Sequence, residues 1–379
     1  MHCQSKEIRY YIVADDLTGA CDSAIAFTGR GMVVEVPLGV DAKALSAGVC
    51  AISTDSRNIR PEAASERVQK ALIGAQAAEE VFKKIDSVLR GNTFAEIRTA
   101  VECFSCELVV MSPAYPALGR VVRDGFLHVE DGTSSPAIDL CEGLRRAGIA
   151  GVVKLRAGGT EECLINRLRD AMRAVDRLVV CDAEKDEDLR VMVSAARMLK
   201  KRILWVGSGG LAHALAHVLP LSVEDRIEEE ELSGCMLLFV GSDHVVTAKQ
   251  LAALEQRSDV SEIAVEDCLR SRPESQVMVL KVSMGSTTEE QIQQAVKSVG
   301  AKGIRGCVLT GGDTAAFVFR SLGVRLLRLT GEFAPGVPEG IAHGGDLDGV
   351  RVIVKSGGFG QQDVLCRIVD RFAGGRELV

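Results

Sequence analysis

The sequence has no excess of positive charge and no long apolar run. A formal net charge of −7 over 379 residues argues against a nucleic-acid-binding protein, whose affinity depends on clustered Lys and Arg at phosphates. An anionic small substrate is still compatible, because a local pocket of Arg and Lys can lie on an acidic protein. No apolar run approaches the roughly 18 residues of a membrane span. We therefore expect neither a nucleic acid nor a membrane as a partner.

Signals for export, for a P-loop and for internal repeats are also missing. The start, MHCQSKE, lacks the basic-then-apolar order of a signal peptide, so we expect a cytoplasmic, reduced protein. The twelve cysteines are scattered, and most fall in apolar patterns where a reduced thiol is a small hydrophobe. Cys103 and Cys106 form a lone CxxC, for which structural thiols are a better interpretation than a zinc or redox site. The absence of GxxxxGK[ST] excludes a P-loop enzyme by sequence.

The alternation of short apolar runs with helical patterns predicts an α/β fold. The 38 glycines against nine prolines indicate many tight strand-to-helix turns rather than disorder. Such alternation implies a largely parallel sheet with helices on both faces. In the first half, the expected strands are 10–14, 33–37, 49–54, 81–85, 108–112, 152–155, 178–182 and 203–207. The expected helices lie near 18–30, 61–79, 94–104, 160–174, 187–199 and 210–218, and the turn-rich stretch 113–135 interrupts the rhythm.

The length of 379 residues predicts two domains. The pattern fails near 221–234, where a run of acidic residues is most simply a solvated linker. Beyond it, a second alternation predicts strands at 236–240, 263–265, 277–282, 308–310 and 352–355, with helices near 245–257, 287–299, 314–322 and 362–372. We expect an N-terminal domain over 1–228 and a C-terminal domain over 229–379, each a mostly parallel sheet with helices on both faces.

Two adjacent carboxylates, Asp15 and Asp16, end the first expected strand. In an α/β protein, a strand end followed by a helix N-terminus is where ligands bind. Two carboxylates there are costly unless a cation, a polyol or a set of donors uses them. Thr18 is expected to cap the following helix, with Asp22 in its first turn. Capping explains Thr18 and one of the two aspartates, but it does not explain why both Asp15 and Asp16 are present. The two aspartates are therefore a candidate functional site.

Polar clusters follow three further strands of the first half. They are TDSR (54–57), KKIDSVLRGN (83–92) and SPAYP (112–116), the last followed by Gly119 and Arg120. Because parallel strand ends converge on one edge of a sheet, we expect all four clusters to share a cleft. Carboxylates and hydroxyls suit sugar hydroxyls, while Arg57 and Arg90 suit a carboxylate or phosphate through forked pairing. Any one cluster alone is better explained by a surface turn with a local ion pair, but four clusters at matching strand ends are not.

Glycine-rich turns follow three strands of the second half. They are Gly241-Ser242, the turn TGGDT (310–314) and KSGGFG (355–360). Such strand-to-helix turns aim backbone N–H groups and a helix dipole at an anion, which is how phosphates are held. Each turn alone could be a plain tight turn.

One further glycine turn supports a different interpretation. Residues 207–212, GSGGLA, fit the dinucleotide pattern GxGxxA after an expected strand, which would indicate an NAD-dependent hydroxy-acid dehydrogenase. The turn lies at the end of a domain, however, and the helix after it leads into the acidic run. A packing turn is therefore the better interpretation.

Taken together, the motifs closely resemble those of the four-carbon acid sugar kinases. The matching pieces, in family order, are ADDLTGACDSA (14–24), STDSR (53–57), KKIDSVLRGN (83–92), SPAYPALGR (112–120), DGFLHV (124–129), GSGGLA (207–212), TGGDTA (310–315), GEFAPGVPEG (331–340) and VKSGGFG (354–360). The resemblance implies ATP-dependent phosphorylation of the terminal hydroxyl of a tetronate-type acid such as threonate, erythronate or a 3-oxo-tetronate. It also implies an N-terminal acid-sugar domain and a C-terminal nucleotide domain.

The resemblance also implies roles for individual residues. Those that would contact ATP are Ser242, Gly311, Gly312, Asp313, Thr314, Gly357 and Gly358. Those that would surround the acid sugar are Asp15, Asp16, Asp55, Arg57, Lys84, Asp86, Ser87 and Arg90. Arg57 and Arg90 are candidates for holding the substrate carboxylate, and either Asp86 or Asp16 would accept the hydroxyl proton. Mg²⁺ would bridge the ATP phosphates, and Asp313 could lie near it or be an N-cap.

At one turn this chain departs from the family. The family usually reads Gly-Ser-Cys-Ser at the first nucleotide turn, whereas this chain reads Gly241-Ser242-Asp243-His244. Asp243 adds negative charge where phosphates would bind, which supports a third interpretation, a non-catalytic acid-sugar-binding protein. A homodimer is compatible with the sequence, which defines neither the oligomeric state nor the substrate stereochemistry.

Overall fold

The computed structural model describes residues 8–38, 48–130, 136–156, 158, 160–173, 177–221, 234–265, 276–299 and 303–373. The chain divides into two compact units. The N-terminal unit takes residues 8–33 and 48–221, and the C-terminal unit takes 34–38 and 234–373. The boundary expected near residue 228 lies outside the described residues, as do residues 222–233 of the acidic run.

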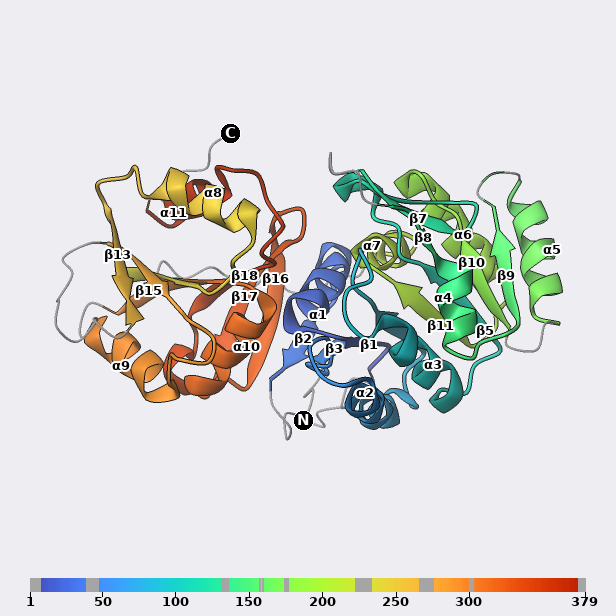
Figure 1. Ribbon diagram of the computed structural model, residues 1–379, viewed down its shortest axis with the longest axis horizontal. Coiled ribbons are helices and arrows are strands. Elements are labelled where there is room, and N and C mark those ends of the chain that lie inside the picture. The colour runs from blue at the N-terminus through green and yellow to red at the C-terminus, as the bar shows by residue number, and fades with distance from the viewer. Residues whose placement is uncertain are drawn as a thin grey trace. The chain divides into compact units, whose positions relative to one another are not determined.

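The N-terminal unit is built on a parallel sheet (Figure 1). In order across the sheet, its strands are β3 (Val49–Ser53), β1 (Tyr10–Ala14), β4 (Glu80–Lys84), β11 (Ile203–Gly207), β5 (Leu108–Ser112), β10 (Leu178–Cys181) and β9 (Val152–Leu155). Every neighbouring pair runs parallel. Strand β1 is buried along its whole length, as a central strand covered on both faces must be.

The helices of this unit pack as two series. In one, α1 (Leu17–Ala24) contacts α7 (Gly209–His217), which contacts α6 (Asp186–Met198), which contacts α5 (Glu161–Ala171). In the other, α2 (Pro61–Ala75) contacts α3 (Thr93–Cys103), which contacts α4 (Leu140–Arg146). Helix α6 buries Leu189, Met192, Val193 and Ala196, an apolar stripe at helical spacing. The predicted helix near 18–30 continues beyond α1 as a 3-10 helix over Ile25–Arg30.

The turn-rich stretch 113–135 is partly a small antiparallel sheet. Strands β6 (Arg120–Arg123), β7 (Phe126–Val129) and β8 (Ile138–Asp139) form it, after a 3-10 turn at Pro116–Leu118. Residues 131–135 lie outside the described part. The described part of this interruption therefore forms a separate small sheet between β5 and α4.

The C-terminal unit has a mixed sheet (Figure 1). In order, its strands are β13 (Val260–Ala264), β14 (Val277–Lys281), β12 (Cys235–Val240), β15 (Ile304–Thr310), β18 (Arg351–Lys355), β17 (Val337–His343), β16 (Leu326–Ala334) and β2 (Val34–Pro37). The pairs from β13 to β18 are parallel, and those from β18 to β2 are antiparallel. Strands β16 and β17 were not expected from the sequence. Strand β2, from the N-terminal half of the chain, joins this sheet, where buried Glu35 pairs with Arg328 at 2.9 Å.

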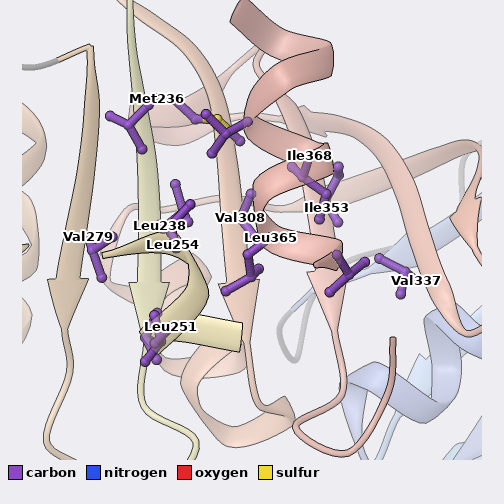
Figure 2. Close-up of a cluster of buried hydrophobic side chains, with 14 residues drawn as sticks. Met236, Leu238, Leu251, Leu254, Val279, Val308, Val337, Ile353, Leu365 and Ile368 are labelled. Carbon is purple, nitrogen blue, oxygen red and sulfur yellow. The ribbon is translucent and has the colours of Figure 1, made fainter. Parts of the chain in front are cut away.

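Helices cover both faces of this second sheet (Figure 1). Helix α8 (Val245–Leu254) contacts α11 (Val364–Ala373), and α9 (Glu289–Val299) contacts α10 (Gly312–Ser321). Between the sheet and the pair α8–α11 lies a buried apolar cluster that includes Leu238, Leu254, Ile353, Leu365 and Ile368 (Figure 2). The prediction of an α/β fold with two mostly parallel sheets is confirmed.

Candidate functional site

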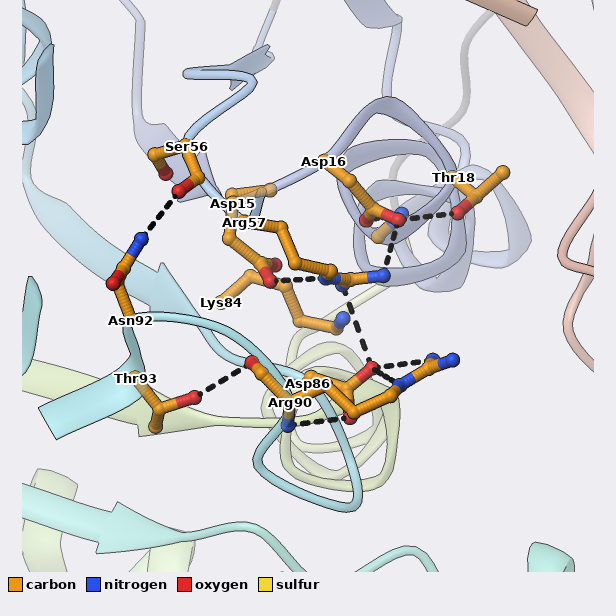
Figure 3. A network of polar contacts seen from close by, with 12 residues as sticks. Asp15, Asp16, Thr18, Ser56, Arg57, Lys84, Asp86, Arg90, Asn92 and Thr93 are labelled. Atoms are coloured by element: carbon orange, nitrogen blue, oxygen red, sulfur yellow. Dashed lines mark hydrogen bonds and ion pairs between the residues drawn. The ribbon is translucent and has the colours of Figure 1, made fainter. Parts of the chain in front are cut away.

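Arg57 joins the carboxyl ends of three adjacent strands, β1, β3 and β4. Its Nε lies 2.7 Å from Asp15 Oδ2, and its Nη1 lies 2.6 Å from Asp16 Oδ2. Its Nη2 lies 3.5 Å from Asp86 Oδ2, so one guanidinium contacts three carboxylates (Figure 3). All three aspartates are buried, and the Arg57 side chain is only 14% exposed. Three of the four clusters expected at one edge of the sheet therefore meet.

The loop after β4 folds around Asp86. The carboxylate accepts hydrogen bonds from the backbone N–H groups of Val88 (3.0 Å) and Arg90 (3.1 Å). It also accepts from the guanidinium of Arg90, with Nη2 2.7 Å from Oδ2. At the end of the loop, Gly91 has φ +79, and a Cβ there would lie 2.8 Å from Arg57 Cγ. Only glycine combines this backbone with so close an approach.

Asp16 caps helix α1, so the expectation that Thr18 is the cap is wrong. Asp16 Oδ1 accepts from the N–H of Gly19 at 2.7 Å, and the Thr18 hydroxyl donates to Asp16 Oδ2 at 2.9 Å. A carboxylate one residue before the helix reaches the third helical N–H, whereas Thr18 is already inside the first turn. Asp22 is not in the first turn either; a Cβ on Gly209, the first residue of α7, would lie 2.5 Å from its Oδ2.

Three cations balance the three carboxylates. They are Arg57, Arg90 and Lys84, whose side chains differ in exposure. Lys84 is 5% exposed, and within the described ranges its ammonium makes no hydrogen bond or ion pair. Its ammonium nevertheless lies beside Asp16: a Cβ on Gly19 would be 2.6 Å from Asp16 Oδ1 and 2.8 Å from Lys84 Nζ. Lys84 thus supplies a buried positive charge that no described side chain pairs directly.

The carboxylates of the cluster differ in acidity. For Asp15 and Asp86, burial pushes the pKa upward, but the charges and hydrogen bonds of the neighbouring cations outweigh burial, and both pKa values lie below the ordinary one. For Asp16, burial together with the negative charge of Asp15 outweighs Arg57 and Lys84, and its pKa is raised. For Arg57, burial is again outweighed, here by the aspartates, and its pKa is raised. Asp16 is therefore the carboxylate that binds a proton most readily.

A second buried ion pair, which sequence reasoning missed, lies beneath the cluster. Lys83 Nζ is 2.7 Å from Glu96 Oε2, with both side chains at most 1% exposed. Glu96 Oε1 accepts from the Ser56 hydroxyl at 2.6 Å, and Asn92 Nδ2 donates to the Ser56 carbonyl at 2.8 Å. The signal available in the sequence was an acidic residue, Glu96, on the apolar face of an expected helix. This pair fixes the loop that carries Arg57.

Some expected site residues lie apart from these contacts. The Asp55 carboxylate accepts from the Ser53 hydroxyl at 2.6 Å, and Asp55 is exposed with φ +46, a left-handed conformation that aspartate adopts more readily than most residues other than glycine. Ser87 is half-buried next to Asp86. The fourth cluster, after β5, is separated from β4 by β11, and its Ala114 carbonyl accepts from the Ser208 hydroxyl at 3.0 Å.

In the C-terminal unit the three glycine turns converge. They follow β12, β15 and β18, which are neighbours in the sheet. A Cβ on Gly357 would lie 2.2 Å from Ser242 Oγ, and one on Gly241 would lie 2.3 Å from Thr314 Oγ1. A Cβ on Gly311 would lie 3.3 Å from the same Thr314 oxygen. The turns also lie at the N-termini of α8 and α10, where helix dipoles favour an anion.

The residues that cap helices α8 and α10 were not predicted from the sequence. The N-cap of α10 is Gly311, while Asp313 is exposed in the first turn, so the interpretation of Asp313 as the cap is wrong. His244 is the N-cap of α8; its Nδ1 accepts from the N–H of Val246 at 3.2 Å. A Cβ on Gly358 would lie 3.2 Å from His244 Nε2. The departure from the family motif thus places a histidine at the N-cap of α8, where the family usually has a serine.

The turn GSGGLA (207–212) packs tightly against its surroundings. A Cβ on Gly207 would lie 2.5 Å from the Ser112 carbonyl oxygen, and one on Gly210 would lie 2.4 Å from that of Ala114. These glycines are needed for the approach of α7 to the loop after β5. The structure thus gives the turn the packing role expected of it.

Three negative observations concern the described ranges only. No three or more His, Cys, Asp or Glu side chains there are grouped to hold a metal ion. No helix there is both long and apolar enough to cross a membrane. The cysteines there, including Cys103 and Cys106, are free thiols.

Comparisons with known proteins match both units. A family model described as a sugar-binding N-terminal domain matches residues 10–215, and one described as a nucleotide-binding C-terminal domain matches 274–365. The chain is 32% identical to a D-threonate kinase of Bordetella bronchiseptica over 94% of this chain and 95% of that one. It is 26% identical to a 3-oxo-tetronate kinase of Pseudomonas fluorescens, over 96% and 97% respectively. A crystal structure from Salmonella typhimurium LT2 shares the fold, with a TM-score of 0.75 at 22% identity, over 96% of this chain and all of that one.

The fold and the two matches define a two-domain enzyme class, whose domain models are described as sugar-binding and nucleotide-binding. The chain belongs to the four-carbon acid sugar kinase family, and it is a phosphotransferase with an alcohol group as acceptor. The motif resemblance is confirmed. Neither alternative, a hydroxy-acid dehydrogenase or a non-catalytic binding protein, is supported by the comparisons.

Proposed function

We propose that this kinase uses ATP and Mg²⁺ to phosphorylate the terminal hydroxyl of a four-carbon sugar acid in the cytoplasm. The observation that carries the proposal is the cluster of buried carboxylates and cations in the N-terminal unit, where Arg57 contacts three aspartates. Its carboxylates can accept from sugar hydroxyls, and its cations suit an acid and a transferred phosphoryl group. Relatives named D-threonate kinase and 3-oxo-tetronate kinase support an acid of this size.

The N-terminal domain, over 1–228, would bind the acid sugar. The residues proposed to surround it are Asp15, Asp16, Asp55, Arg57, Lys84, Asp86, Ser87 and Arg90. Arg90, whose side chain is 56% exposed, is the cation most open to a substrate carboxylate. Arg57, engaged by three aspartates, would shape the site and fix the carboxylates rather than hold the acid alone.

Asp16 would accept the proton of the reacting hydroxyl. A general base works best when its pKa lies near the working pH, and burial and Asp15 raise the pKa of Asp16. The pKa of Asp86, by contrast, is lowered, because hydrogen bonds from Arg90 and nearby cations outweigh its burial. Lys84, beside Asp16, would stabilise charge on the transferred phosphoryl group.

The C-terminal domain, over 229–379, would bind ATP at the three converging turns. The residues proposed to contact it are Ser242, Gly311, Gly312, Asp313, Thr314, Gly357 and Gly358. Mg²⁺ is usually held by one or two carboxylates together with substrate phosphates, and it neutralises phosphate charge. Asp313, exposed in the first turn of α10, would supply such a carboxylate.

Release of ADP from Mg-ATP tests the proposal. The panel contains the isomers of threonate and erythronate, 3-oxo-tetronates and common sugars. We expect one four-carbon acid to stimulate ADP release well above the other compounds. Binding of ATP without stimulation by any four-carbon acid would contradict the substrate class. Absence of ATP binding would contradict the kinase activity and favour the interpretation of a non-catalytic acid-sugar-binding protein, which the altered turn 241–244 suggested.

The homodimer stays a prediction, which light scattering of the purified protein tests.

A further inference from the structure

A buried lysine lies directly beneath the last glycine turn of the C-terminal unit. Lys355 ends strand β18 and has no exposed surface. Its Nζ lies 2.9 Å from the Ser356 carbonyl oxygen, 3.2 Å from that of Phe359 and 3.3 Å from that of Gly357. The ammonium thus donates toward three carbonyls of the turn that follows it in the chain.

Two buried side chains of α8 hold the same turn. The Thr247 hydroxyl donates to the Gly357 carbonyl at 2.8 Å. Gln250 Nε2 lies within 3.1 Å of the carbonyl oxygens of Phe359, Gly360 and Gln361. Neither side chain has exposed surface. Lys355, Thr247 and Gln250, called the carbonyl clamp below, therefore bind the carbonyls along residues 356–361.

Binding the carbonyls on one side sets the direction of the N–H groups. In a trans peptide the C=O and the following N–H point in opposite directions, and the described chain has no cis peptide bond. The carbonyls of Ser356, Gly357 and Phe359 point to the clamp, so the N–H groups of Gly357, Gly358 and Gly360 point away from it. Within the described ranges these three N–H groups have no acceptor. An array of free N–H groups of this kind is an anion site.

Among the described residues, no carboxylate neutralises the charge of Lys355. In the part of the chain that the structure describes, carbonyl oxygens and the Thr247 hydroxyl are its only partners. A buried charge without a counter-ion is costly, and burial lowers the pKa of Lys355 to about 8. An anion on the outer side of the turn would supply the missing negative charge.

We propose that the carbonyl clamp, with Lys355 at its centre, shapes the turn 356–361 for the polyphosphate of the nucleotide and supplies a positive charge behind it. Lys355 is then a positioning residue, since it acts on the ligand through the backbone of the turn. The sequence pattern predicted contacts from Gly357 and Gly358 but gave no role to Lys355, Thr247 or Gln250. The identity of the ligand as ATP rests on the proposed function.

Binding of ATP and of inorganic tripolyphosphate by calorimetry tests the clamp. In Lys355→Met, which keeps the length of the side chain but removes its charge and donors, we expect both affinities to fall by about 10- to 100-fold. The Michaelis constant for the acid sugar should stay unchanged, which a general loss of structure would not allow. The matched control is Lys281→Met, at the end of neighbouring strand β14, where the lysine is half-exposed and pairs with Glu262 at 2.6 Å. It should bind both anions like the wild type.

A milder variant covers the case in which Lys355→Met does not fold. Thr247→Val is nearly isosteric and removes only the hydroxyl that donates to Gly357. We expect about a 3- to 10-fold loss of affinity for both anions. Unchanged tripolyphosphate affinity in either folded variant would overturn the clamp, as would a wild type that does not bind tripolyphosphate. A wild type that binds tripolyphosphate but not ATP would instead count against the proposed function.

Discussion

Removal of Arg57 is expected to destabilise the N-terminal unit in a pH-dependent way. In Arg57→Met, Asp15, Asp16 and Asp86 stay buried but lose the cation that contacts all three. Breaking a buried ion pair by removing one partner costs about 3–5 kcal/mol, because the remaining charge is left uncompensated. Since Lys84 and Arg90 remain close to the cluster, we expect a loss of about 3 kcal/mol in the free energy of unfolding at pH 7.

The pH dependence follows from the pKa directions. In the wild type the pKa values of Asp15 and Asp86 are lowered, so these carboxylates stabilise the fold above their ordinary pKa and lose that effect as the pH falls through the folded values. Without Arg57, burial dominates at Asp15 and Asp16, whose folded pKa values then lie above the ordinary one, while Asp86 keeps its hydrogen bonds from Arg90. The variant then gains stability as the pH falls through those raised values. The deficit relative to the wild type should therefore shrink between pH 7 and pH 5.

Urea unfolding followed by tryptophan fluorescence measures this effect. The single tryptophan, Trp205, is buried in β11, so its emission reports on the N-terminal unit. Arg67→Met is the matched control, because within the described residues exposed Arg67 donates only to the Thr54 and Asp55 carbonyls. This variant should cost less than about 1 kcal/mol. If Arg57→Met resembled this control, or if its deficit were constant from pH 7 to pH 5, the electrostatic account of the cluster would be refuted.

Three further predictions concern turnover, substrate affinity and the buried lysine. In steady-state kinetics, Asp16→Asn should lower kcat by about 100-fold with an unchanged Michaelis constant for ATP. Asp86→Asn should mainly raise the Michaelis constant for the acid. The reverse pattern would identify Asp86 as the residue that accepts the hydroxyl proton. Arg90→Met should raise the Michaelis constant for the acid by at least about 10-fold, and an unchanged value would remove Arg90 from the carboxylate site. Because burial lowers the pKa of Lys355 from 10.5 to about 8, the unfolded chain binds more protons between these values, and Lys355 adds stability as the pH rises through that window. The unfolding free energy of the wild type minus that of Lys355→Met should thus increase by about 2–3 kcal/mol from pH 7.5 to pH 10, and a pH-independent difference in urea titrations would contradict the burial of a charged ammonium.

Local sequence patterns predicted the parallel strands and most helices, because each is a short apolar run or an amphipathic repeat bounded by a turn. They did not predict β16 and β17, whose pairing is antiparallel and interrupted by register shifts. The pairing of β2 with β16 was also beyond local reasoning, since it joins Glu35 and Arg328, which are far apart in sequence. Contacts of this kind depend on tertiary packing rather than on local preference.

The candidate site shows the same division. Strand-end clusters identified Asp16, Arg57 and Asp86, because parallel strands bring such ends to one edge. The choice of Asp16 over Thr18 as the helix cap was not predictable, because both residue types cap helices and the backbone decides between them. Lys83 and Glu96 could not be recognised as a pair, since their only local signal is a charge within an apolar pattern.

The central claim is transfer of the ATP γ-phosphoryl group to the terminal hydroxyl of a four-carbon acid. Proton-coupled ³¹P NMR of the reaction with Mg-ATP and the stimulating acid tests it most directly. A phosphate ester on a terminal CH₂ couples to two protons, so the account predicts a triplet that grows in step with ADP. A doublet would place the phosphate on an inner hydroxyl, and a singlet of inorganic phosphate would mean hydrolysis instead of transfer; either result would contradict the claim.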